Sequence, residues 1–502
     1  MNLNNRSSLL KINTATSLLY QIVVFICGFV LPKLIIDNYG SAVNGLIASI
    51  TQFLGIIALC ELGMGAVVPA SLYKPLADKN IDAISKVVLS SEKFYRRIAI
   101  LMLLYVLVLA VVYPYIVDGF PFIYTASLLV IIASSTFAQY FFGISYSLLI
   151  TADQRQYITY FVNGGTLIVN LILSYILIRV GASIHMVKLL SAAIFILRPI
   201  CYTIYVKRHY PLNKNVVYKE EPIKQKWNGV AQHLAYTVQE KAGFIILSVA
   251  CSLEAVSVYS VYFLITEGLR AFVYSITSGL SSYIGNILAK SETELLKSGF
   301  MKIEWALHSM AIIVYSCAAV LIMPFVSIYT QGVTDANYMI PVFPVLICAV
   351  ICIRCLQLPY TLVVQAAGHF KETQNSAILE PIVNIIISLL LVKEYNLTGV
   401  AIGMLFSVIY RMMYLSIYLT RHILHNSGRL LFKRLIVDVV LAIAIFLLCS
   451  HYQLQSVSYM SWVILAVEVA STSILIALGI NLLFYSTETL SLFRSVICRN
   501  NK

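Results

Sequence analysis

The sequence predicts an all-α polytopic membrane protein of about fourteen transmembrane helices, built as two parallel six-helix repeats with two extra C-terminal helices. The 502-residue chain is 60% hydrophobic and only 11% charged. A soluble globule of this composition would leave too much apolar surface in water. Apolar runs of about 20 residues, the length that crosses a bilayer core, recur along the whole chain. In addition, the two halves of the chain share a residue pattern.

The repeat is clearest between residues 146–209 and 360–422. Subtracting 214 pairs Tyr360, Ala366, Asn384, Ser388 and the basic Lys393 with Tyr146, Ala152, Asn170, Ser174 and Arg179. Subtracting 213 pairs Arg411, Ile417, Tyr418, Arg421 and His422 with Arg198, Ile204, Tyr205, Arg208 and His209, and more weakly Ala255, Val256 and Gly268 with Ala42, Val43 and Gly55. One residue fewer in the intervening loop explains the change of offset. The pattern therefore predicts one module present twice.

The apolar runs predict the helices in order. After the polar residues 1–16, the first run is too long for a cleavable signal peptide and is predicted as the first span. The first six spans are 17–36, 43–70, 98–117, 122–150, 157–179 and 184–206. The second six are 229–252, 255–288, 305–328, 339–364, 374–394 and 398–420, followed by 432–450 and 461–485. The predicted domains are an N-lobe (1–210), a cytoplasmic linker (211–226), a C-lobe (227–425) and a last part with two spans and a tail (426–502).

Basic residues set the orientation, because cytoplasmic loops carry an excess of Lys and Arg. With the N-terminus inside, most of the 35 Lys and Arg residues lie on the cytoplasmic side, while Arg179 and Lys393 lie on outer loops. Both termini are therefore predicted in the cytoplasm. Six spans per repeat make the repeat parallel, which in transporters implies two lobes with the site between them. The net charge of +13 then reflects orientation, not a nucleic-acid partner.

The sequence carries no motif for enzymatic chemistry. No phosphate-binding loop, nucleophile elbow or metal-spaced His cluster is present, and the outer loops are short. The ten cysteines sit mainly in apolar runs, which disfavours a disulfide framework. Cys348, Cys352 and Cys355 share a helical face, but no His or acidic residue joins them, so helix packing is favoured over a metal site. A non-enzyme without cofactor or metal is predicted.

Charged residues within the spans are the candidate site. A charge at a helix centre costs about 2.5–3.5 kcal/mol on insertion scales, so each must face a partner, the bundle interior or water. Basic residues from both halves predict a wet, cationic cavity that binds substrate. The candidates are Arg270, Lys241, Arg354, Arg411, Arg198 and Lys33. Lys188 is interpreted as an anchor at an outer helix end and is left out of the site.

Three acidic residues are candidates for ion coupling: Glu61, Glu240 and Glu267. Glu61 lacks an obvious local partner, and acids of this kind in membranes usually carry function. Adjacent Glu240 and Lys241 point about 100° apart on a helix, so they cannot face the same surface.

Simpler explanations stay open for several of these charges. Glu267 and Arg270, at positions i and i+3, can neutralise each other. A structural pair of Lys33 with Asp37 is as plausible as a site. Arg198 and Arg411, which match in the repeat, can extend along the helix as interfacial anchors.

Further residues carry a family resemblance. Asn384-x-x-x-Ser388, followed by Gly399-Val400-Ala401-Ile402-Gly403 and Ser407, resembles the C-terminal lobe of Wzx-type polysaccharide and O-antigen flippases. Gly40-x-x-x-Asn44-Gly45-Leu46 and Glu61-Leu62-Gly63-Met64-Gly65 are similar to the family's first two spans. These flippases belong to the multidrug/oligosaccharidyl-lipid/polysaccharide (MOP) exporter superfamily. The resemblance covers nearly the whole chain.

The resemblance implies a V-shaped pair of lobes in a bacterial cytoplasmic membrane. It implies alternating-access export of an undecaprenyl-diphosphate-linked oligosaccharide, with H⁺ or Na⁺ as candidate coupling ions. Membrane lipids and a polysaccharide polymerase are the expected partners. The last two spans resemble a pair that flanks a groove for the lipid tail. Three alternatives remain: a drug/cation antiporter of the multidrug and toxic compound extrusion (MATE) type, a lipid II flippase, or, from another class, a membrane polysaccharide polymerase or ligase.

Overall fold

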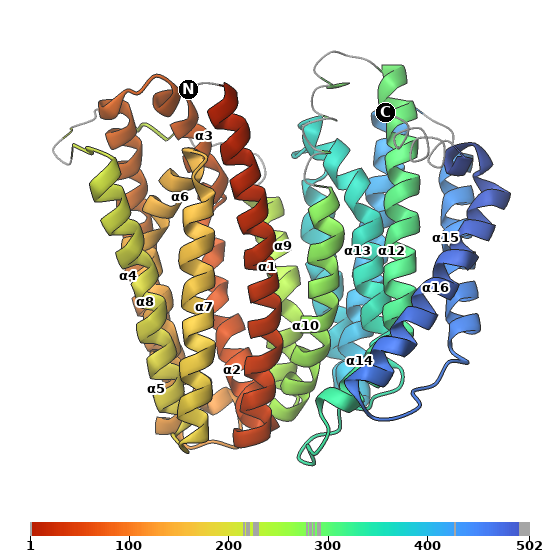
Figure 1. The fold of residues 1–502 in the computed structure, drawn as a ribbon, viewed down its shortest axis with the longest axis horizontal. Coiled ribbons are helices and arrows are strands. Elements are labelled where there is room, and N and C mark those ends of the chain that lie inside the picture. Colours follow the sequence, from red (N-terminus) through yellow and green to blue (C-terminus); the bar gives the residue numbers. More distant parts are fainter. Residues whose placement is uncertain are drawn as a thin grey trace. The chain divides into compact units, whose positions relative to one another are not determined.

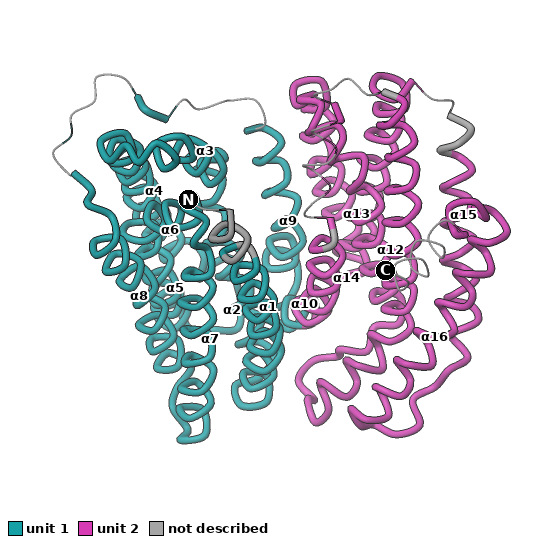
Figure 2. The backbone as a smooth tube through the Cα atoms, turned by 45° about the horizontal axis from the view of Figure 1, so that its top comes forward, with its two compact units in different colours: residues 1–257 teal, residues 258–502 magenta. Residues whose placement is uncertain are grey.

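The computed structural model describes residues 3–213, 216, 221–223, 230–277, 280, 284, 287–288, 293–425 and 428–490. All regular elements within these residues are helices (Figure 1). The chain divides into two compact units, residues 1–257 and 258–502 (Figure 2). An all-α architecture is thus confirmed, while the domain boundaries predicted from the sequence stay a prediction.

Unit 1 contains most of the first repeat. Its elements are α1 (Leu3–Tyr39), α2 (Ser41–Leu54), η1 (Gly55–Glu61), α3 (Met64–Ala77), α4 (Ile81–Ile116), α5 (Phe122–Ala138), η2 (Gln139–Gly143), α6 (Ile144–Ala152), α7 (Gln156–Arg179), α8 (Ile184–His209), α9 (Val230–Ala250) and the start of α10 (Leu253–Ile276). Five helices pack in the order α1, α2, α5, α8, α7 and back to α1. They therefore form a closed ring within unit 1.

Within the described residues, unit 2 contains the remainder of α10 and five further long helices. These are α12 (Thr293–Tyr329), α13 (Phe343–Ala366), α14 (Gln374–His422), α15 (Gly428–Cys449) and α16 (Tyr459–Phe484). Helix α12 lies at the centre of this unit, because α13, α15 and α16 all pack against it. The two helices outside the repeat, α15 and α16, are thus attached to a helix of the repeat.

The chain is a multi-pass membrane protein by the length and composition of its helices. Eleven helices within the described ranges are long and apolar enough to cross a membrane. Helix α14 is one of them, although its 49 residues contain a non-helical residue, Asn396 (φ 46°, ψ −126°). The predicted spans 374–394 and 398–420 lie on either side of this break. Helices α9 and α15 also coincide with predicted spans, but they carry more charged and polar residues.

Several predicted boundaries are wrong. The predicted span 43–70 is three elements, because the helix tightens at Gly55 and ends at Glu61. The spans predicted from 98 and 305 begin much earlier, at Ile81 and Thr293. Polar first turns hid these starts, since hydropathy marks the membrane-embedded part of a helix and not its capped end. The last residues of the predicted span 255–288 lie largely outside the described residues.

The motif that carries the family resemblance is a helix-packing motif. Asn384 and Ser388 are fully buried in the first half of α14, facing Gly403 in the second half. Ser388 Oγ donates to Asn384 Oδ1 at 3.0 Å and lies 3.3 Å from the carbonyl oxygen of Val400. Small residues let two helices approach closely where apolar surface alone gives no driving force in lipid. The motif thus specifies a tight helical hairpin.

The two halves also share local geometry. Ser174 Oγ donates to Asn170 Oδ1 at 3.4 Å, as Ser388 does to Asn384. The Tyr205 and His209 rings stack with centroids 4.1 Å apart, and Tyr418 and His422 stack at 4.5 Å, both at 18°. These residues are the ones that the sequence repeat pairs, so the repeat is expressed in side-chain contacts.

The hairpin in α14 generates a stability prediction. A Cβ atom at Gly403 would lie 2.7 Å from the Ser388 nitrogen and 2.9 Å from the Asn384 carbonyl oxygen, which are backbone atoms that cannot rotate away. We expect Gly403→Ala to destabilise the protein by about 1–3 kcal/mol through overpacking. Thermal unfolding of the purified protein in detergent measures this. Gly479→Ala is the control, because a Cβ atom there meets nothing within 4 Å and should be neutral or slightly stabilising. Equal melting temperatures for the two variants would contradict the close packing.

Candidate functional site

Two irregular helical segments of unit 1 lie at the candidate site. The first is η1, a 3₁₀ helix that ends at Glu61 and is followed by Leu62 (φ 49°) and Gly63 (φ 78°) in the left-handed region. Glycine adopts this backbone freely, whereas Leu62 carries a cost of about 1–2 kcal/mol. Local strain of this kind is retained mainly at functional sites. The break therefore supports a functional role for the residue directly before it, Glu61.

The second irregular segment is η2, a single π-helical turn between α5 and α6. A π turn inserts one residue into a helix and occurs often at functional sites. Gly143 ends it where α8 comes closest, since a Cβ atom there would lie 2.9 Å from Cβ of Pro199. The turn rotates Tyr140 and Phe141 relative to a regular helix.

A side-chain hydrogen bond joins the two irregular segments. The Tyr140 hydroxyl donates to Glu61 Oε1. Tyr95 of α4 is buried beside them, with its ring centroid 6.3 Å from that of Tyr140. Among the described residues, the Tyr95 hydroxyl has no hydrogen-bond partner. Glu61, which had no local partner in the sequence, thus finds one from a helix nearly eighty residues away.

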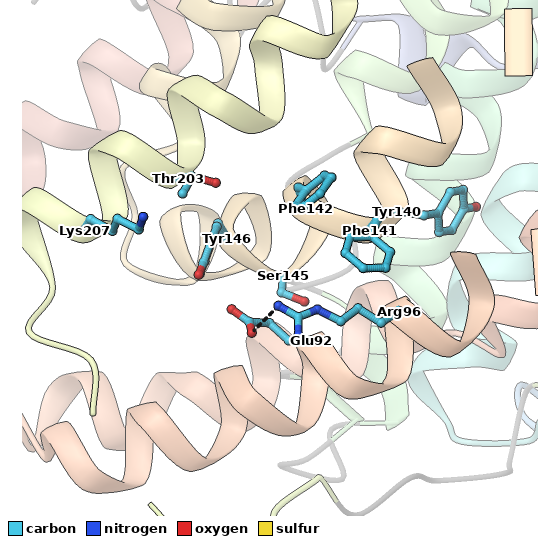
Figure 3. Close-up of a pocket in the computed structure, with 9 residues that line it drawn as sticks. All are labelled: Glu92, Arg96, Tyr140, Phe141, Phe142, Ser145, Tyr146, Thr203 and Lys207. Atoms are coloured by element: carbon cyan, nitrogen blue, oxygen red, sulfur yellow. Dashed lines mark hydrogen bonds and ion pairs between the residues drawn. The ribbon is translucent and has the colours of Figure 1, made fainter. Parts of the chain in front are cut away.

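Tyr140 also lines a small pocket of about 180 Å³ (Figure 3). Glu92 and Arg96 of α4 form an ion pair of 3.4 Å at this pocket, and the Arg96 guanidinium lies 5.5 Å from the ring centroid of Phe141. The other lining residues are Phe142, Ser145 and Tyr146 from η2 and α6, and Thr203 and Lys207 from α8. The pocket combines two cations, one carboxylate and aromatic rings, so it favours polar and anionic groups.

The equivalent place in unit 2 is filled. Tyr360, the repeat partner of Tyr146, donates to Glu304 at 2.6 Å, and His308 follows one turn later on α12. There α15 inserts Arg434 at 3.7 Å from Glu304 and Asp438 at 2.6 Å from His308. Helix α15, outside the repeat, thus adds charged partners in unit 2 at the place where unit 1 has a pocket. Sequence comparison missed this correspondence because Glu92 and Glu304 differ by 212, a third offset.

Lys241 of α9 lies against η1 in unit 1. Its Nζ donates to Gln52 Oε1 at 3.2 Å, and a Cβ atom at Gly55 would lie 2.5 Å from the same nitrogen. Glu240 is close enough to act on Lys241 electrostatically. Gly55 is thus where the lysine crosses the helix backbone, which explains a glycine at the start of η1.

Three predicted site residues come together in unit 2. Arg270 pairs with Glu267 at 2.5 Å on α10, and its guanidinium lies 5.7 Å from the ring centroid of Tyr274. Arg354 of α13 is 7% exposed, and it acts electrostatically on the Cys355 thiol together with Glu267 and Arg270. The described residues of this cluster are thus two bases and one acid.

The other predicted basic residues bond locally. Arg411 donates to the Thr373 carbonyl oxygen at 3.1 Å and to Ser376, and lies 3.9 Å from Glu380. Lys33 pairs with Asp37 at 2.6 Å, one of the two explanations left open by the sequence.

Arg198 is the repeat partner of Arg411 and also bonds within its unit. Its Nε donates to Thr166 at 2.7 Å, and its guanidinium lies 4.3 Å from the ring centroid of Phe195. A single wet cavity holding all six basic candidates stays a prediction.

Two further sequence inferences can be placed. The Cys355 Sγ lies 3.9 Å from the Tyr315 hydroxyl and the Cys352 Sγ 3.9 Å from the Ala311 carbonyl oxygen, as packing residues would. Lys188 lines a cavity in unit 1, although the sequence analysis interpreted it as an anchor. The cavity is formed by several helices, and the sequence alone does not show which helices are neighbours.

Comparisons with known proteins identify the fold. No family model and no curated protein sequence matches the chain. Among solved structures, it is similar to the lipid II flippase MurJ in an inward closed conformation, with a TM-score of 0.68, 12% identity and coverage of 94% of this chain and 98% of that chain. A multidrug resistance MATE family transporter of the MOP superfamily, inward-facing, matches with a TM-score of 0.59, 13% identity and coverage of 80% and 95%.

A third similar structure is a MOP superfamily transporter from Pyrococcus furiosus, described as having a binding pocket of reverse polarity. It matches with a TM-score of 0.51, 11% identity and coverage of 84% and 95%. The chain therefore has the fold of the MOP superfamily. Its structural neighbours are transporters and flippases, not enzymes.

The junction of Glu61 and Tyr140 generates a second prediction. Tyr140→Phe removes the hydroxyl that donates to a carboxyl group, and we expect a loss of about 1–3 kcal/mol in stability. Tyr95→Phe is a matched control on the neighbouring buried ring, whose hydroxyl has no partner in the described part of the chain. That change should be neutral or stabilising. Thermal unfolding of both variants measures the difference, and an equal loss in both would show that the bond contributes nothing.

The contact between Gly55 and Lys241 generates a third prediction. Gly55→Ala places a methyl group where the lysine tip lies, so the flexible Lys241 side chain must leave Gln52. We expect faster labelling of Lys241 by an amine-reactive reagent, measured by mass spectrometry, with stability changed by less than about 1 kcal/mol. Gly65→Ala serves as the control, because a Cβ atom there has open space. Unchanged labelling in Gly55→Ala would refute the contact.

Proposed function

We propose that this protein is a flippase for a lipid-linked oligosaccharide. Its substrate is an undecaprenyl-diphosphate-linked repeat unit, moved by alternating access for export of O-antigen, capsule or another surface polysaccharide. In this proposal it acts in a bacterial cytoplasmic membrane with both termini in the cytoplasm. Membrane lipids surround it, and a polysaccharide polymerase receives the exported unit.

The charge of the buried clusters carries the proposal. Two bases, Arg270 and Arg354, lie with one acid, Glu267, inside unit 2, and Lys241 is a further base inside unit 1. A diphosphate cannot cross hydrocarbon unpaired, because burial of an unpaired charge is prohibitive. Guanidinium and ammonium groups replace its hydration with charge-assisted hydrogen bonds. A carrier of cationic drugs would instead favour acidic residues at these positions.

The extent of the fold similarity also favours a lipid-linked substrate. The MurJ structure matches 94% of this chain, whereas the inward-facing MATE structure matches 80%. The MATE structure, which represents the drug or cation carrier, therefore leaves more of this chain without a structural counterpart. A lipid II flippase remains the nearest alternative, because MurJ itself is one. A membrane polymerase or ligase has no similar support from the fold.

Ion coupling is assigned in this proposal to Glu61. Its carboxyl group follows a helix break, where backbone carbonyl groups lose their helical partners. Broken helices in transporters use such groups to coordinate Na⁺ or to hold a proton. Glu240 and Glu267 are weaker coupling candidates, because each lies beside a basic residue.

A reconstituted assay tests the function. Proteoliposomes carry a labelled undecaprenyl-diphosphate oligosaccharide, and a membrane-impermeant glycosidase reports the fraction on the outer leaflet with time. Arg354→Gln should slow movement at least about tenfold, because a charge-assisted hydrogen bond contributes about 1.5–3 kcal/mol. Arg354→Lys should retain part of the rate. Lys393→Gln, on an exposed residue, should match the wild type.

Three outcomes would contradict the proposal. Movement of lipid II alone, with no transfer of other glycans on the same carrier, would make the protein a lipid II flippase. Efflux of a cationic dye without glycolipid movement would favour the drug antiporter. An unchanged rate in a folded Arg354→Gln protein, judged by its melting temperature, would remove the cluster from the mechanism.

A further inference from the structure

Unit 1 contains a partly open cavity that none of the predicted site residues lines. It has a volume of about 460 Å³ and lies within the ring of α1, α2, α5, α7 and α8, with Gln139 of η2 at its edge. Its one charged lining residue is Lys188, in the second turn of α8. Lys207, Arg96 and Glu92 line the other pocket of unit 1, which shares none of its lining residues with this cavity.

Lys188 is a charge without a counter-charge. Within the described ranges, its ammonium group has no hydrogen bond and no ion pair, and no acidic residue lines the cavity. An ammonium group at membrane depth needs a partner, water or a ligand, because burial of a lone charge is expensive. Three other basic residues of the spans differ from it, since Lys33, Arg270 and Arg411 each lie beside a carboxylate.

The remaining lining groups are suited to a hydroxylated molecule. Hydroxyl and amide side chains reach the cavity from five elements: Thr51, Ser135, Thr136, Gln139, Asn170 and Ser191. Thr51 and Ser191 already donate to backbone carbonyl oxygens of their own helices, so their oxygens accept further bonds. The Asn170 oxygen accepts from Ser174, which leaves its amide hydrogens to donate. Most of the lining surface is apolar, and Leu171 and Phe195 contribute to it.

We propose that this cavity binds a hydroxylated monocarboxylate of about monosaccharide size, with Lys188 as the counter-charge. One cation matches one negative charge, whereas a diphosphate would keep uncompensated charge. A metal cation is excluded by the lysine itself. The volume exceeds by about fifteenfold the roughly 30 Å³ that one water occupies, so a lone halide ion would leave most of the cavity unused. The amide and hydroxyl groups then bond the hydroxyls of the ligand, and Phe195 contacts its apolar face.

This inference goes beyond the proposed function, because it places a soluble ligand inside unit 1 and does not require movement of a lipid-linked glycan. Acidic sugars provide the chemistry, so glucuronate is the probe. Glucose matches its hydroxyls without the charge, and acetate and chloride match the charge without the hydroxylated body. Binding to the purified full-length protein can therefore be tested separately from transport.

Thermal unfolding and isothermal titration with glucuronate test the site at constant ionic strength. At saturation we expect glucuronate to raise the melting temperature by about 2 °C or more, while glucose, acetate and chloride leave it unchanged. Lys188→Gln should weaken glucuronate binding at least about tenfold, because a charge-assisted bond is lost. Gln139→Met keeps Lys188 and should weaken glucuronate binding less than Lys188→Gln does. Lys393→Gln, an exposed lysine in unit 2, should bind as the wild type does.

Several results would overturn the proposal. Equal stabilisation by acetate or chloride would mean a simple anion site. Undiminished binding in Lys188→Gln would place the ligand elsewhere. If the wild-type protein does not bind glucuronate, the cavity is not a binding site and water alone solvates Lys188. This measurement does not require that Lys188→Gln folds.

Discussion

The structure depends on the requirement that backbone and side-chain polar groups inside a membrane find partners within the protein. A continuous helix meets this requirement alone, but unit 1 breaks its second span at Leu62 and Gly63. The break is stable only where neighbouring segments satisfy the groups that it releases. The Tyr140 hydroxyl, brought out by a π turn, bonds Glu61 at this place. Two departures from regular helix thus support each other across the unit.

The same requirement separates structural charges from functional ones. Lys33 and Arg411 lie beside carboxylates, and Arg198 has a hydroxyl group and an aromatic ring. Such residues are adequately explained by packing. Lys188 is different because its ammonium group has no hydrogen bond or ion pair within the described residues and no acidic residue lines its cavity. The charged residues within the spans therefore have different roles. Only their surroundings distinguish a residue that bonds neighbouring helices from one that binds a ligand.

Duplication followed by addition explains the asymmetry of the two units. The repeat places a tyrosine against a glutamate in both, Tyr360 with Glu304 and Tyr146 with Glu92. Helix α15 then adds Arg434 and Asp438 in unit 2, which converts that place into a buried ionic network. Unit 1 lacks an equivalent helix and keeps a pocket (Figure 3). The same pair of residue types thus belongs to an ionic network in unit 2 and lines a pocket in unit 1.

The sequence by itself determined the helical membrane class and the approximate position of most spans, because hydropathy records burial in lipid directly. It also indicated the pair of Glu267 with Arg270 and that of Lys33 with Asp37, since neighbours on one helix are fixed by the helix period. Only the tertiary structure decided the break after Glu61, its bond to Tyr140 and the cavity around Lys188. Those features depend on which helices become neighbours, and contacts between helices far apart in the chain leave no periodic signal in a single sequence.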